Sequence, residues 1–516
     1  MLLTRTSMKK MNQWKALGLL AIALTVVACS DDNNDTDTPS VKPGDEYVWS
    51  TDAGIKACNR ILFTDGKADP NGKEIGNGDQ EIVFTGKQTL KKGTYLLKGW
   101  VYVGKGAELT IEPGTVIKGD KDTKAALIVE RGGKLFAQGT PTQPIVFTSE
   151  QEKGQRKPGD WGGIILCGNA LNNQKEMQIE GGPRTKHGGN DDQDNSGVLS
   201  YVRIEFAGYP FQKDKEINGL TFGSVGSGTT VDHIQVSYSN DDSYEWFGGT
   251  VNAKYLVAYK GWDDDFDTDN GYSGKVQFGL VIRDPRIADG SQSNGFESDN
   301  SADGSNILPF TAATFSNITF IGPKADPSFQ NNTDYINGGD LFPNNGSALG
   351  KFQAAMHLRR NTRLNCFNSV AVGFPVGLIL DNEKGNTQGN AKDGNMTLNN
   401  IWFADMDVVG TDGNKVYEDA LLIEYGKPNV FDYSQRSFSS TYFLAQSGNR
   451  YVEDLGQLLL NGFMPAQGSP LLTAAAFNHT LLNGWFTKVP YIGAFHAGDN
   501  WLDGWTEFDP QHADYR

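Results

Sequence analysis

Three acidic segments in the middle of the chain contain the residues best suited to chemistry. They are N-D-D-S-Y-E-W-F at 240–247, D-D-D-F-D-T-D-N-G at 263–271 and N-G-F-E-S-D-N at 294–300. Carboxylates gathered this densely repel one another unless they are protonated or neutralised by a cation. Ca²⁺ suits such a cluster, because it takes about six to eight oxygen ligands from Asp, Glu and the backbone.

The segments can be aligned on one aromatic residue each, namely Tyr244, Phe266 and Phe296. Because side chains alternate along a strand, the acids one step later should point outward, beside equivalents on neighbouring turns about 5 Å away. This alignment predicts that Glu245, Asp267 and Glu297 share one row. The predicted calcium ligands are Asp242, Glu245, Asp263, Asp265, Asp267, Asp269, Glu297 and Asp299.

No calcium motif supports this prediction. The stretch from Asp265 to Gly271 approaches the start of an EF-hand loop, but its glycine comes one position late. Val276 also occupies the position of the distal acid. The prediction therefore depends on charge density, and a solvated acidic face whose loops lie apart is the alternative.

Two weaker groups of candidate site residues accompany the acidic segments. Aromatic residues alternate with the acids, and exposed rings could stack on sugars, although a place in the core is their alternative role. The ligand-binding candidates are Trp246, Trp262 and Tyr272. A second calcium candidate is a loop rich in Gly and Asn that contains His187, Asp191, Asp192 and Asp194.

The same acids could also serve an enzyme. Hydrolysis of a glycosidic bond needs two carboxylates about 5–10 Å apart, which the pairs Asp242/Asp264 and Asp267/Glu297 can supply. A polysaccharide lyase would instead need Ca²⁺ and a basic residue. Basic residues near the acids in sequence are Lys260, Arg283 and Arg286. Since the motif sets of known pectinases are absent, we favour binding without catalysis.

Short β-branched runs at even spacing must position these acids. L-T-I-E begins at Leu109, L-I-V-E at Leu127, I-V-F-T at Ile145 and I-I-L-C at Ile164, at intervals of 18, 18 and 19 residues. This period is too short for βαβ units of about 30 residues. It is typical of a β-solenoid, whose stacked turns share one core. We therefore predict an all-β fold, a single right-handed parallel β-helix, with a β-sandwich or β-propeller as the rival.

The predicted chain has five parts: a signal peptide at 1–28, an acidic tether at 29–46, an N-terminal cap at 47–94, the β-helix at 95–440 and a C-terminal cap at 441–516. Caps are expected because the ends of a solenoid expose strand edges. The C-terminal cap should contain a short helix, since 451–463 has apolar residues at helical spacing. Its large apolar residues are Trp485, Trp501 and Trp505.

The N-terminus is typical of an exported lipoprotein. Basic residues precede the apolar run Ala16 to Ala28, which ends V-V-A before Cys29. This pattern predicts cleavage before Cys29 and its acylation by palmitate-type chains, with a plain secretory leader as the alternative. The run is shorter than a membrane span of about 20 residues, so no transmembrane segment is predicted in the mature chain.

The charge balance excludes one class of partner. The chain has 46 Lys and Arg against 62 Asp and Glu, a net charge of −16. A protein this acidic repels polyphosphate, so we expect no nucleic-acid binding. The segment S-D-D-N-N-D-T-D-T-P-S after Cys29 has no apolar residue to bury, and we expect it to act as a flexible tether.

Four longer motifs give the chain a family resemblance. They are W-G-G-I-I-L-C-G-N-A at 161–170, G-G-N-D-D-Q-D-N-S-G-V-L-S-Y-V-R-I-E-F-A-G at 188–208, G-W-D-D-D-F-D-T-D-N-G-Y-S-G at 261–274 and S-N-G-F-E-S-D-N at 293–300. The chain resembles, over about 45–516, uncharacterised parallel β-helix lipoproteins of Gram-negative bacteria with TonB-dependent glycan uptake. The resemblance implies an outer-membrane protein that is lipid-anchored through Cys29 and faces the exterior. It implies no activity, and a multidrug-transporter label often attached to such proteins has no physical support.

These features together predict a surface-exposed, lipid-anchored protein with a calcium-supported acidic face. The ligand would be a glycan or a partner protein, such as a TonB-dependent receptor. A polysaccharide lyase or glycoside hydrolase that acts on the same face is one alternative. A structural or adhesive surface protein is the other.

Overall fold

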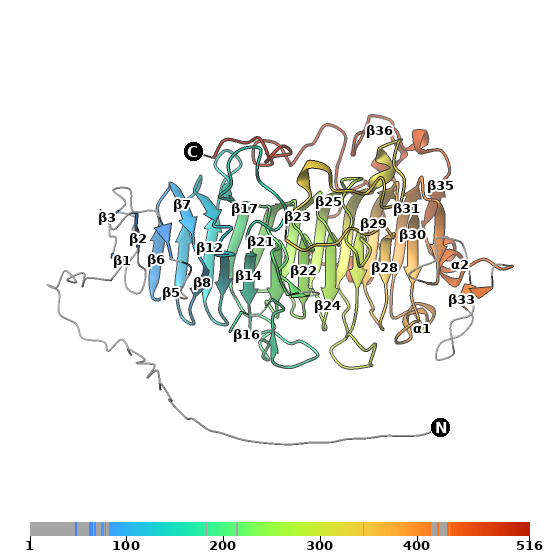
Figure 1. Cartoon of the computed structure of the whole chain (residues 1–516). Helices are drawn as coiled ribbons and strands as arrows, with labels where there is room; N and C mark the ends of the chain where they lie inside the picture. The colour runs from blue at the N-terminus through green and yellow to red at the C-terminus, as the bar shows by residue number, and fades with distance from the viewer. Residues whose placement is uncertain are drawn as a thin grey trace, which may run out of the picture. The chain divides into compact units, whose positions relative to one another are not determined.

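Short strands make up nearly all of the regular secondary structure in the computed structural model of the chain (Figure 1). The structure describes residues 74–76, 78 and 82–515, apart from 182, 213–214, 344, 414–420, 423–430 and 433. It also describes three strands that precede residue 74. Those strands are β1 (Tyr47–Val48), β2 (Ile61–Thr64) and β3 (Lys67–Ala68). The predicted signal peptide, the tether and Cys29 lie outside the described residues.

Most strands belong to two long sheets in which neighbours run parallel. The 11-stranded sheet contains β5 (Ile82–Phe84), β8 (Trp100–Val103), β11 (Ala126–Val129), β14 (Gly163–Cys167), β20 (Leu220–Gly223), β22 (Tyr244–Phe247), β24 (Phe266–Asp269), β26 (Phe296–Ser298), β28 (Ala354–Leu358), β30 (Val376–Leu380) and β32 (Val408–Thr411). The first part of the 15-stranded sheet contains β4 (Glu74–Ile75), β6 (Lys87–Leu90), β7 (Thr94–Leu97), β9 (Glu108–Ile111), β10 (Val116–Gly119), β12 (Lys134–Gln138) and β13 (Ile145–Ser149). Its second part contains β17 (Gly197–Glu205), β21 (Thr230–Ser237), β23 (Asn252–Tyr259), β25 (Lys275–Ile282), β27 (Thr314–Ile321), β29 (Asn365–Val372), β31 (Leu398–Ala404) and β35 (Arg450–Val452).

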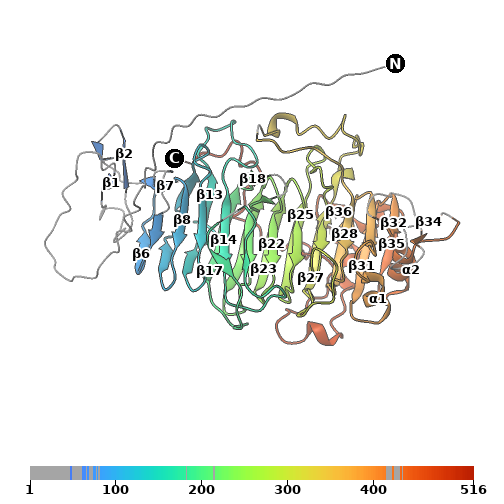
Figure 2. The same cartoon turned by 60° about the horizontal axis from the view of Figure 1, so that its bottom comes forward.

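The chain alternates between the two sheets (Figures 1 and 2). From β5 to β14 two short strands of the 15-stranded sheet lie between successive strands of the 11-stranded sheet, and from β20 to β30 one long strand lies between them. Leu127 on β11, for example, pairs with Val101 on β8 and with Ile164 on β14. This arrangement confirms the prediction of an all-β parallel β-helix. Regular coils already include β5 and β6, which pair with β8 and β9, so they extend into the segment that was predicted as the N-terminal cap.

A left-handed residue bends each long strand of the 15-stranded sheet. On β17 this residue is Tyr201, which separates the half that pairs with β12 from the half that pairs with β13. The equivalent residues on successive strands have φ between 50° and 63° and are His233, Tyr255, Phe278, Asn317, Asn368 and Asn400. Because of this bend, the 15-stranded sheet forms two faces of the coil. The sequence pattern did not predict the bend.

Alternating residues of both sheets fill the interior of the coil. On the 11-stranded sheet the inward row runs through Leu127, Ile164, Leu220, Tyr244 and Phe266, all of them buried. These side chains belong to one continuous cluster that extends from Ile75 to Phe443. The shared core explains why no coil would be stable alone.

Loops and hairpins connect the coils. Two-stranded pairs are β15 (Met177–Gln178) with β16 (Lys186–His187), β18 (Pro210–Gln212) with β19 (Lys215–Glu216), β33 (Leu421–Leu422) with β34 (Phe431–Asp432), and β36 (Leu460–Asn461) with β37 (Met464–Pro465). Among the described residues the α-helices are α1 (Thr387–Lys392) and α2 (Phe438–Ala445). No helix in the described part of the chain is long and apolar enough to span a membrane.

The end of the chain differs from the predicted cap. Residues 451–463 form part of β35, a 3₁₀ turn at Leu455–Leu458 and β36, so the predicted helix there is wrong. Their apolar side chains are distributed between strand and turn, and α2 lies before them. The final segment runs back along the coil, and the C-terminus lies near the strands of the N-terminal half (Figure 1). Trp501 and Trp505 thus pack against the side of the coil, not over its end.

Candidate functional site

One outward row of the 11-stranded sheet changes from apolar to acidic in the middle of the coil. The row runs through Ile128, Ile165, Thr221, Glu245, Asp267, Glu297 and His357, which pair in register on successive strands. Their inward neighbours Tyr244, Phe266 and Phe296 also pair in register, with ring centroids 5.6 and 5.7 Å apart. The structure therefore confirms the alignment that the sequence predicted, in which one acid from each of three coils occupies the same row.

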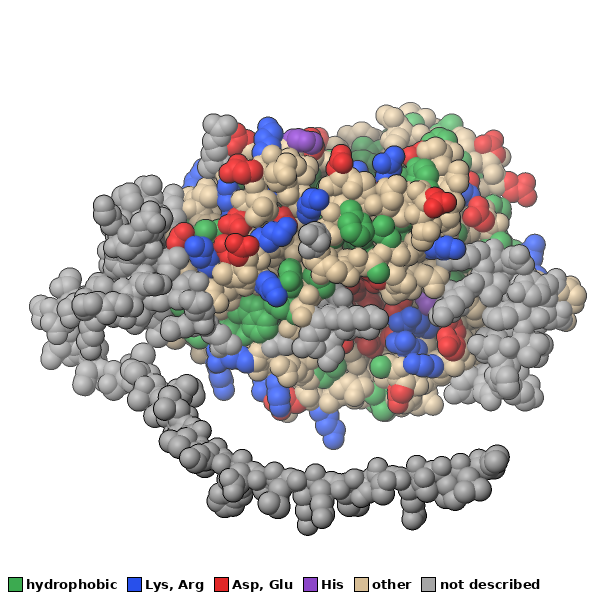
Figure 3. All heavy atoms as spheres, in the orientation of Figure 1, with side chains coloured by type: hydrophobic (Ala, Val, Ile, Leu, Met, Phe, Trp, Pro, Cys, Tyr) green, Lys and Arg blue, Asp and Glu red, His purple; other side chains and the backbone are tan. Residues whose placement is uncertain are grey.

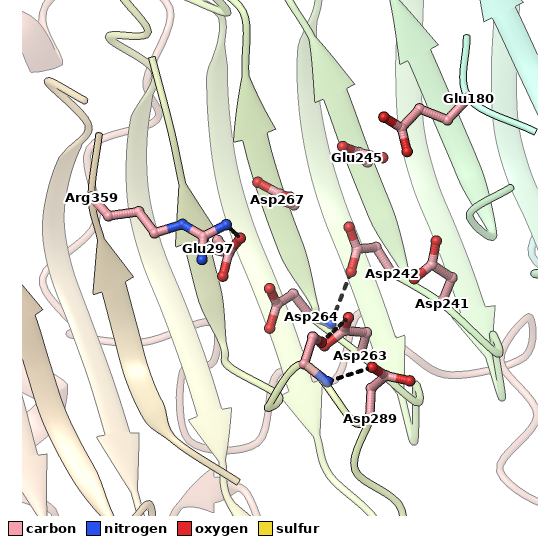
Figure 4. Close-up of a pocket in the computed structure, with 11 residues that line it drawn as sticks. Glu180, Asp241, Asp242, Glu245, Asp263, Asp264, Asp267, Asp289, Glu297 and Arg359 are labelled. Atoms are coloured by element: carbon pink, nitrogen blue, oxygen red, sulfur yellow. Dashed lines mark hydrogen bonds and ion pairs between the residues drawn. The ribbon is translucent and has the colours of Figure 1, made fainter. Parts of the chain in front are cut away.

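These three acids lie in a cavity of about 230 Å³ on the outside of the coil (Figure 4). The cavity lining contains nine carboxylates, one serine and one arginine: Glu180, Asp241, Asp242, Glu245, Asp263, Asp264, Asp267, Asp289, Glu297, Ser291 and Arg359. In the space-filling view, acidic side chains line a hollow, and basic side chains lie at its edge (Figure 3). Five of the eight predicted calcium ligands are in this cavity: Asp242, Glu245, Asp263, Asp267 and Glu297.

Loops that precede the strands supply the other walls. Asp242 accepts a hydrogen bond through Oδ1 from the backbone N–H of Asp264 at 2.9 Å. Asp264 in turn accepts one through Oδ1 from the N–H of Asn294, and Asn294 accepts one from the N–H of Ala354 at 3.0 Å. The same contact thus repeats from coil to coil. One oxygen of each aspartate fixes the next loop, which leaves the other oxygen available to the cavity.

Three groups of carboxylates come close enough to share a cation. In each group one oxygen per residue lies within 4.8 Å of the others. The groups are Asp241, Asp242 and Asp263; Asp242, Glu245 and Asp267; and Asp264, Asp267 and Glu297. The first and third groups have no residue in common, so two cations could occupy them together.

Burial and mutual repulsion perturb these acids strongly. The pKa values of Asp264 and Asp267 are raised well above the ordinary range, first by burial and then by neighbouring carboxylates. The pKa values of Asp242, Glu245 and Asp263 are raised for the same two reasons. Glu297 is the exception, because although burial favours its neutral form, Arg359 and His357 lower its pKa to about 2.

Three predicted calcium ligands lie outside the cavity. Asp265 precedes β24, so strand alternation does not govern it, and it forms a fully buried ion pair with Arg283 at 3.0 Å. Burial raises the pKa of Asp265 to about 7, although Arg283 opposes this shift. Asp299 binds Arg359 and Arg360, and Asp269 accepts a hydrogen bond from the N–H of Asn270.

The predicted sugar-binding aromatics are core residues. Trp246, Trp262 and Tyr272 each have 0% exposure. Trp246 occupies an inward position on β22, with its ring stacked 5.4 Å from Phe222 and 5.3 Å from Tyr272. The prediction that these rings stack on a ligand is therefore wrong, because no ring face reaches the surface.

The second acidic loop is held in place by hydrogen bonds to its own acids. Asp192 and Asp194 accept hydrogen bonds from the N–H of Leu171 and the amide of Asn169, which holds the loop in place. His187 is fully buried against Ser224, with 2.8 Å between Nδ1 and Oγ, and burial lowers its pKa to about 3. None of these residues belongs to a carboxylate group close enough to share a cation in the described part of the chain.

Other cavity residues have weaker sequence signals. Asp241 and Asp264 lie in the acidic segments but were not among the predicted calcium ligands. Glu180 follows β15, and Asp289 and Ser291 come from the loop between β25 and β26. Arg359 directly follows β28. Only the stacking of coils brings Glu180 and Arg359 into the site, since they are far from the acidic segments in sequence.

A family model supports this fold. The model of the family described as "Pectate-lyase like beta helix domain" matches residues 82–430. A search of curated proteins found no match. Among solved structures, the crystal structure of the Dettilon tailspike protein is similar at 12% identity and a TM-score of 0.26. The match covers 62% of this chain and 60% of the tailspike chain, which is less than two thirds of its length.

Proposed function

Since the chain belongs to the family of pectate-lyase-like beta helix domains, we propose that it binds a polysaccharide through a calcium-supported acidic cavity. The observation that carries this proposal is the row of Glu245, Asp267 and Glu297. Three successive coils place a carboxylate at the same outward position. A row of like charges on neighbouring strands destabilises a sheet unless something neutralises it.

The donor set suits a hard divalent cation. All the candidate ligands are carboxylate oxygens, which Ca²⁺ prefers. The Oδ1 atoms of Asp263 and Asp267 are buried and have no hydrogen-bond partner. A buried carboxylate oxygen without a partner is costly, and a cation would remove that cost. The first and third carboxylate groups support two ions at once.

A polysaccharide that carries carboxylates fits the neutralised cavity best. A bound Ca²⁺ would offer coordination positions to carboxylate and hydroxyl oxygens of the sugar. Arg359 and Arg360 contribute positive charge at the end of the acidic row, where Arg359 binds Glu297 and both arginines bind Asp299. An acidic glycan could therefore contact a cation and a guanidinium on the same face.

Calcium titration by calorimetry tests the proposal directly. We expect saturable binding of Ca²⁺ by the chain after EDTA treatment, with up to two ions per chain, and retention on immobilised polygalacturonate only when Ca²⁺ is present. A neutral glucan serves as the control ligand. Absence of Ca²⁺ binding, or equal retention of polygalacturonate in EDTA, would refute the calcium-supported site.

Hydrolysis is a second candidate, and one specific observation favours it. The low pKa of Glu297 and the raised pKa of Asp264 and Asp267 place an ionised and a protonated carboxyl in one cavity. Enzymes that cleave glycosidic bonds use such a pair as base and acid. If the chain hydrolyses polygalacturonate, new reducing ends should appear, and Glu297→Gln should abolish them while Glu383→Gln, on an exposed loop, should not.

The lipid anchor and the cell-surface location are part of the same proposal. A surface-exposed, lipid-anchored protein could present its cavity to polysaccharide outside the cell. The supporting features are the small residues before Cys29 and the acidic segment after it. Protease treatment of intact cells tests the location: cleavage before lysis is expected, whereas full protection until lysis would refute exposure.

A further inference from the structure

The C-terminal strap, residues 474–515, is attached to the outside of the coil. None of its residues belongs to the cluster that fills the coil interior, which ends at Phe443. None of its described residues forms a strand that pairs with either long sheet. The core of the coil is therefore complete without the strap, which crosses the side formed by the 15-stranded sheet (Figure 1).

Side-chain amides of the coil hold the strap by its backbone. Gln277 donates from Nε2 to the carbonyl of Thr487 at 2.7 Å and accepts through Oε1 from its N–H at 2.8 Å. Gln235 makes the same two bonds to Glu507, at 2.7 and 2.9 Å. Asn368 likewise bonds both polar groups of the Ala476 backbone, at 3.1 and 2.8 Å.

The row of left-handed residues provides further contacts of this kind. Asn317 donates to the carbonyl of Tyr491 and Asn400 to that of Ala474, both at 2.8 Å. These bonds reach the strap backbone and not its side chains. Five strands of the 15-stranded sheet thus offer side-chain amides to the backbone of the strap, which itself forms turns and a 3₁₀ helix at Thr480–Leu482.

Aromatic anchors distinguish the strap from other peptides. Phe495 and Trp505 are almost fully buried in a cluster on the outer surface of the coil, separate from the interior core. The ring centroid of Trp501 lies 5.3 Å from that of Tyr255, and the ring centroid of Trp505 lies 5.6 Å from that of His233. Main-chain hydrogen bonds give affinity and side-chain pockets give specificity when a peptide is bound on a folded surface.

We propose that this side of the coil is a peptide-binding surface and that the C-terminal strap is its ligand within the same chain. The strap can leave and rebind while the coil remains folded. The surface recognises the strap backbone through Gln235, Gln277 and Asn368 and selects its ligand through the pockets for Phe495 and Trp505. This inference is independent of the proposed calcium site, which lies on the other sheet.

Exchange after cleavage tests the proposal on the full chain. A protease site inserted between Gln467 and Gly468, both exposed, allows the folded protein to be cut before the strap. We expect the fragment to remain bound during size-exclusion chromatography and to be displaced by excess fluorescent peptide of sequence 468–516. The coil should keep its β-sheet circular dichroism throughout.

Substitution of the amides supplies a second measurement. Gln235→Ala, Gln277→Ala and Asn368→Ala should each weaken binding of the labelled peptide about tenfold, which corresponds to about 1.4 kcal/mol. Gln193→Ala, at an exposed position in the loop between β16 and β17, should not. Immediate loss of the cut fragment, absence of exchange, or unfolding of the coil on release would each overturn the proposal. Should an amide variant not fold, exchange in the cut wild-type chain still decides.

Discussion

Replacement of Asp267 by asparagine should stabilise the calcium-free chain and weaken its response to calcium. Asp267 lies between Glu245 and Glu297 on strands about 4.8 Å apart, and it belongs to two of the three carboxylate groups. Two ionised carboxylates about 5 Å apart repel by roughly 3 kcal/mol at an effective dielectric constant of about 20. Partial protonation reduces this repulsion, so we expect Asp267→Asn to raise the free energy of unfolding in EDTA by about 1–3 kcal/mol.

The effect should depend on pH in a defined direction. Burial, and then Glu245 and Glu297, raise the pKa of Asp267 well above its ordinary range. Between the unfolded pKa of about 4 and this raised value, the folded chain binds more protons than the unfolded chain. The stability of the calcium-free wild type should therefore fall as pH rises through this window. Asp267→Asn should flatten that slope and should have little effect below about pH 4, where the carboxyl is protonated in both states.

Thermal unfolding measured in EDTA and in excess Ca²⁺ provides the assay. Ligand at 100 times its dissociation constant stabilises a chain by about 2.7 kcal/mol per site, and Asp267→Asn should lose much of that gain. Asp334→Asn, at an exposed loop position, is the matched control. If Asp267→Asn lowers the melting temperature equally in EDTA and in Ca²⁺, the residue merely supports packing and the repulsion argument is refuted.

Three other substitutions test separate parts of the account. Arg283→Ala should lower the free energy of unfolding, measured in urea, by about 3–5 kcal/mol, because it leaves Asp265 buried without its partner. The added change Asp265→Asn should recover part of this loss. Full stability of Arg283→Ala would contradict the argument. Trp246→Ala should lower the free energy of unfolding by about 3–5 kcal/mol, while the folded fraction still binds polygalacturonate. Loss of binding without loss of stability would show that Trp246 contacts the ligand. Cys29→Ser should abolish incorporation of labelled palmitate, whereas unchanged incorporation would rule out this residue as the lipid site.

Much of the site was predictable because the fold repeats. Once Tyr244, Phe266 and Phe296 are aligned, strand alternation places the acid that follows each of them on the outer surface. The same reasoning failed for Asp265, which lies just before β24, where no strand geometry determines its direction. Alternation gives the right position for Trp246, which lies two residues after the inward Tyr244. Its predicted ligand role was wrong because that prediction used composition, which does not distinguish an inward aromatic from an exposed one.

The repeated short β-branched runs predicted the parallel β-helix, because such runs share a core by stacking as coils. Their spacing of 18 or 19 residues is not the length of a coil, since Leu127 pairs with Val101, 26 residues earlier, and Leu109 pairs with Leu135. The density of acids in three successive coils also determined where a charged row would occur. Tertiary structure decided the remainder, because it depends on contacts between residues far apart in sequence. It brought Glu180 and Arg359 to the cavity and directed Asp265 to Arg283. It also returned the tryptophans of the C-terminal segment along the coil, where side-chain amides could bind the strap backbone.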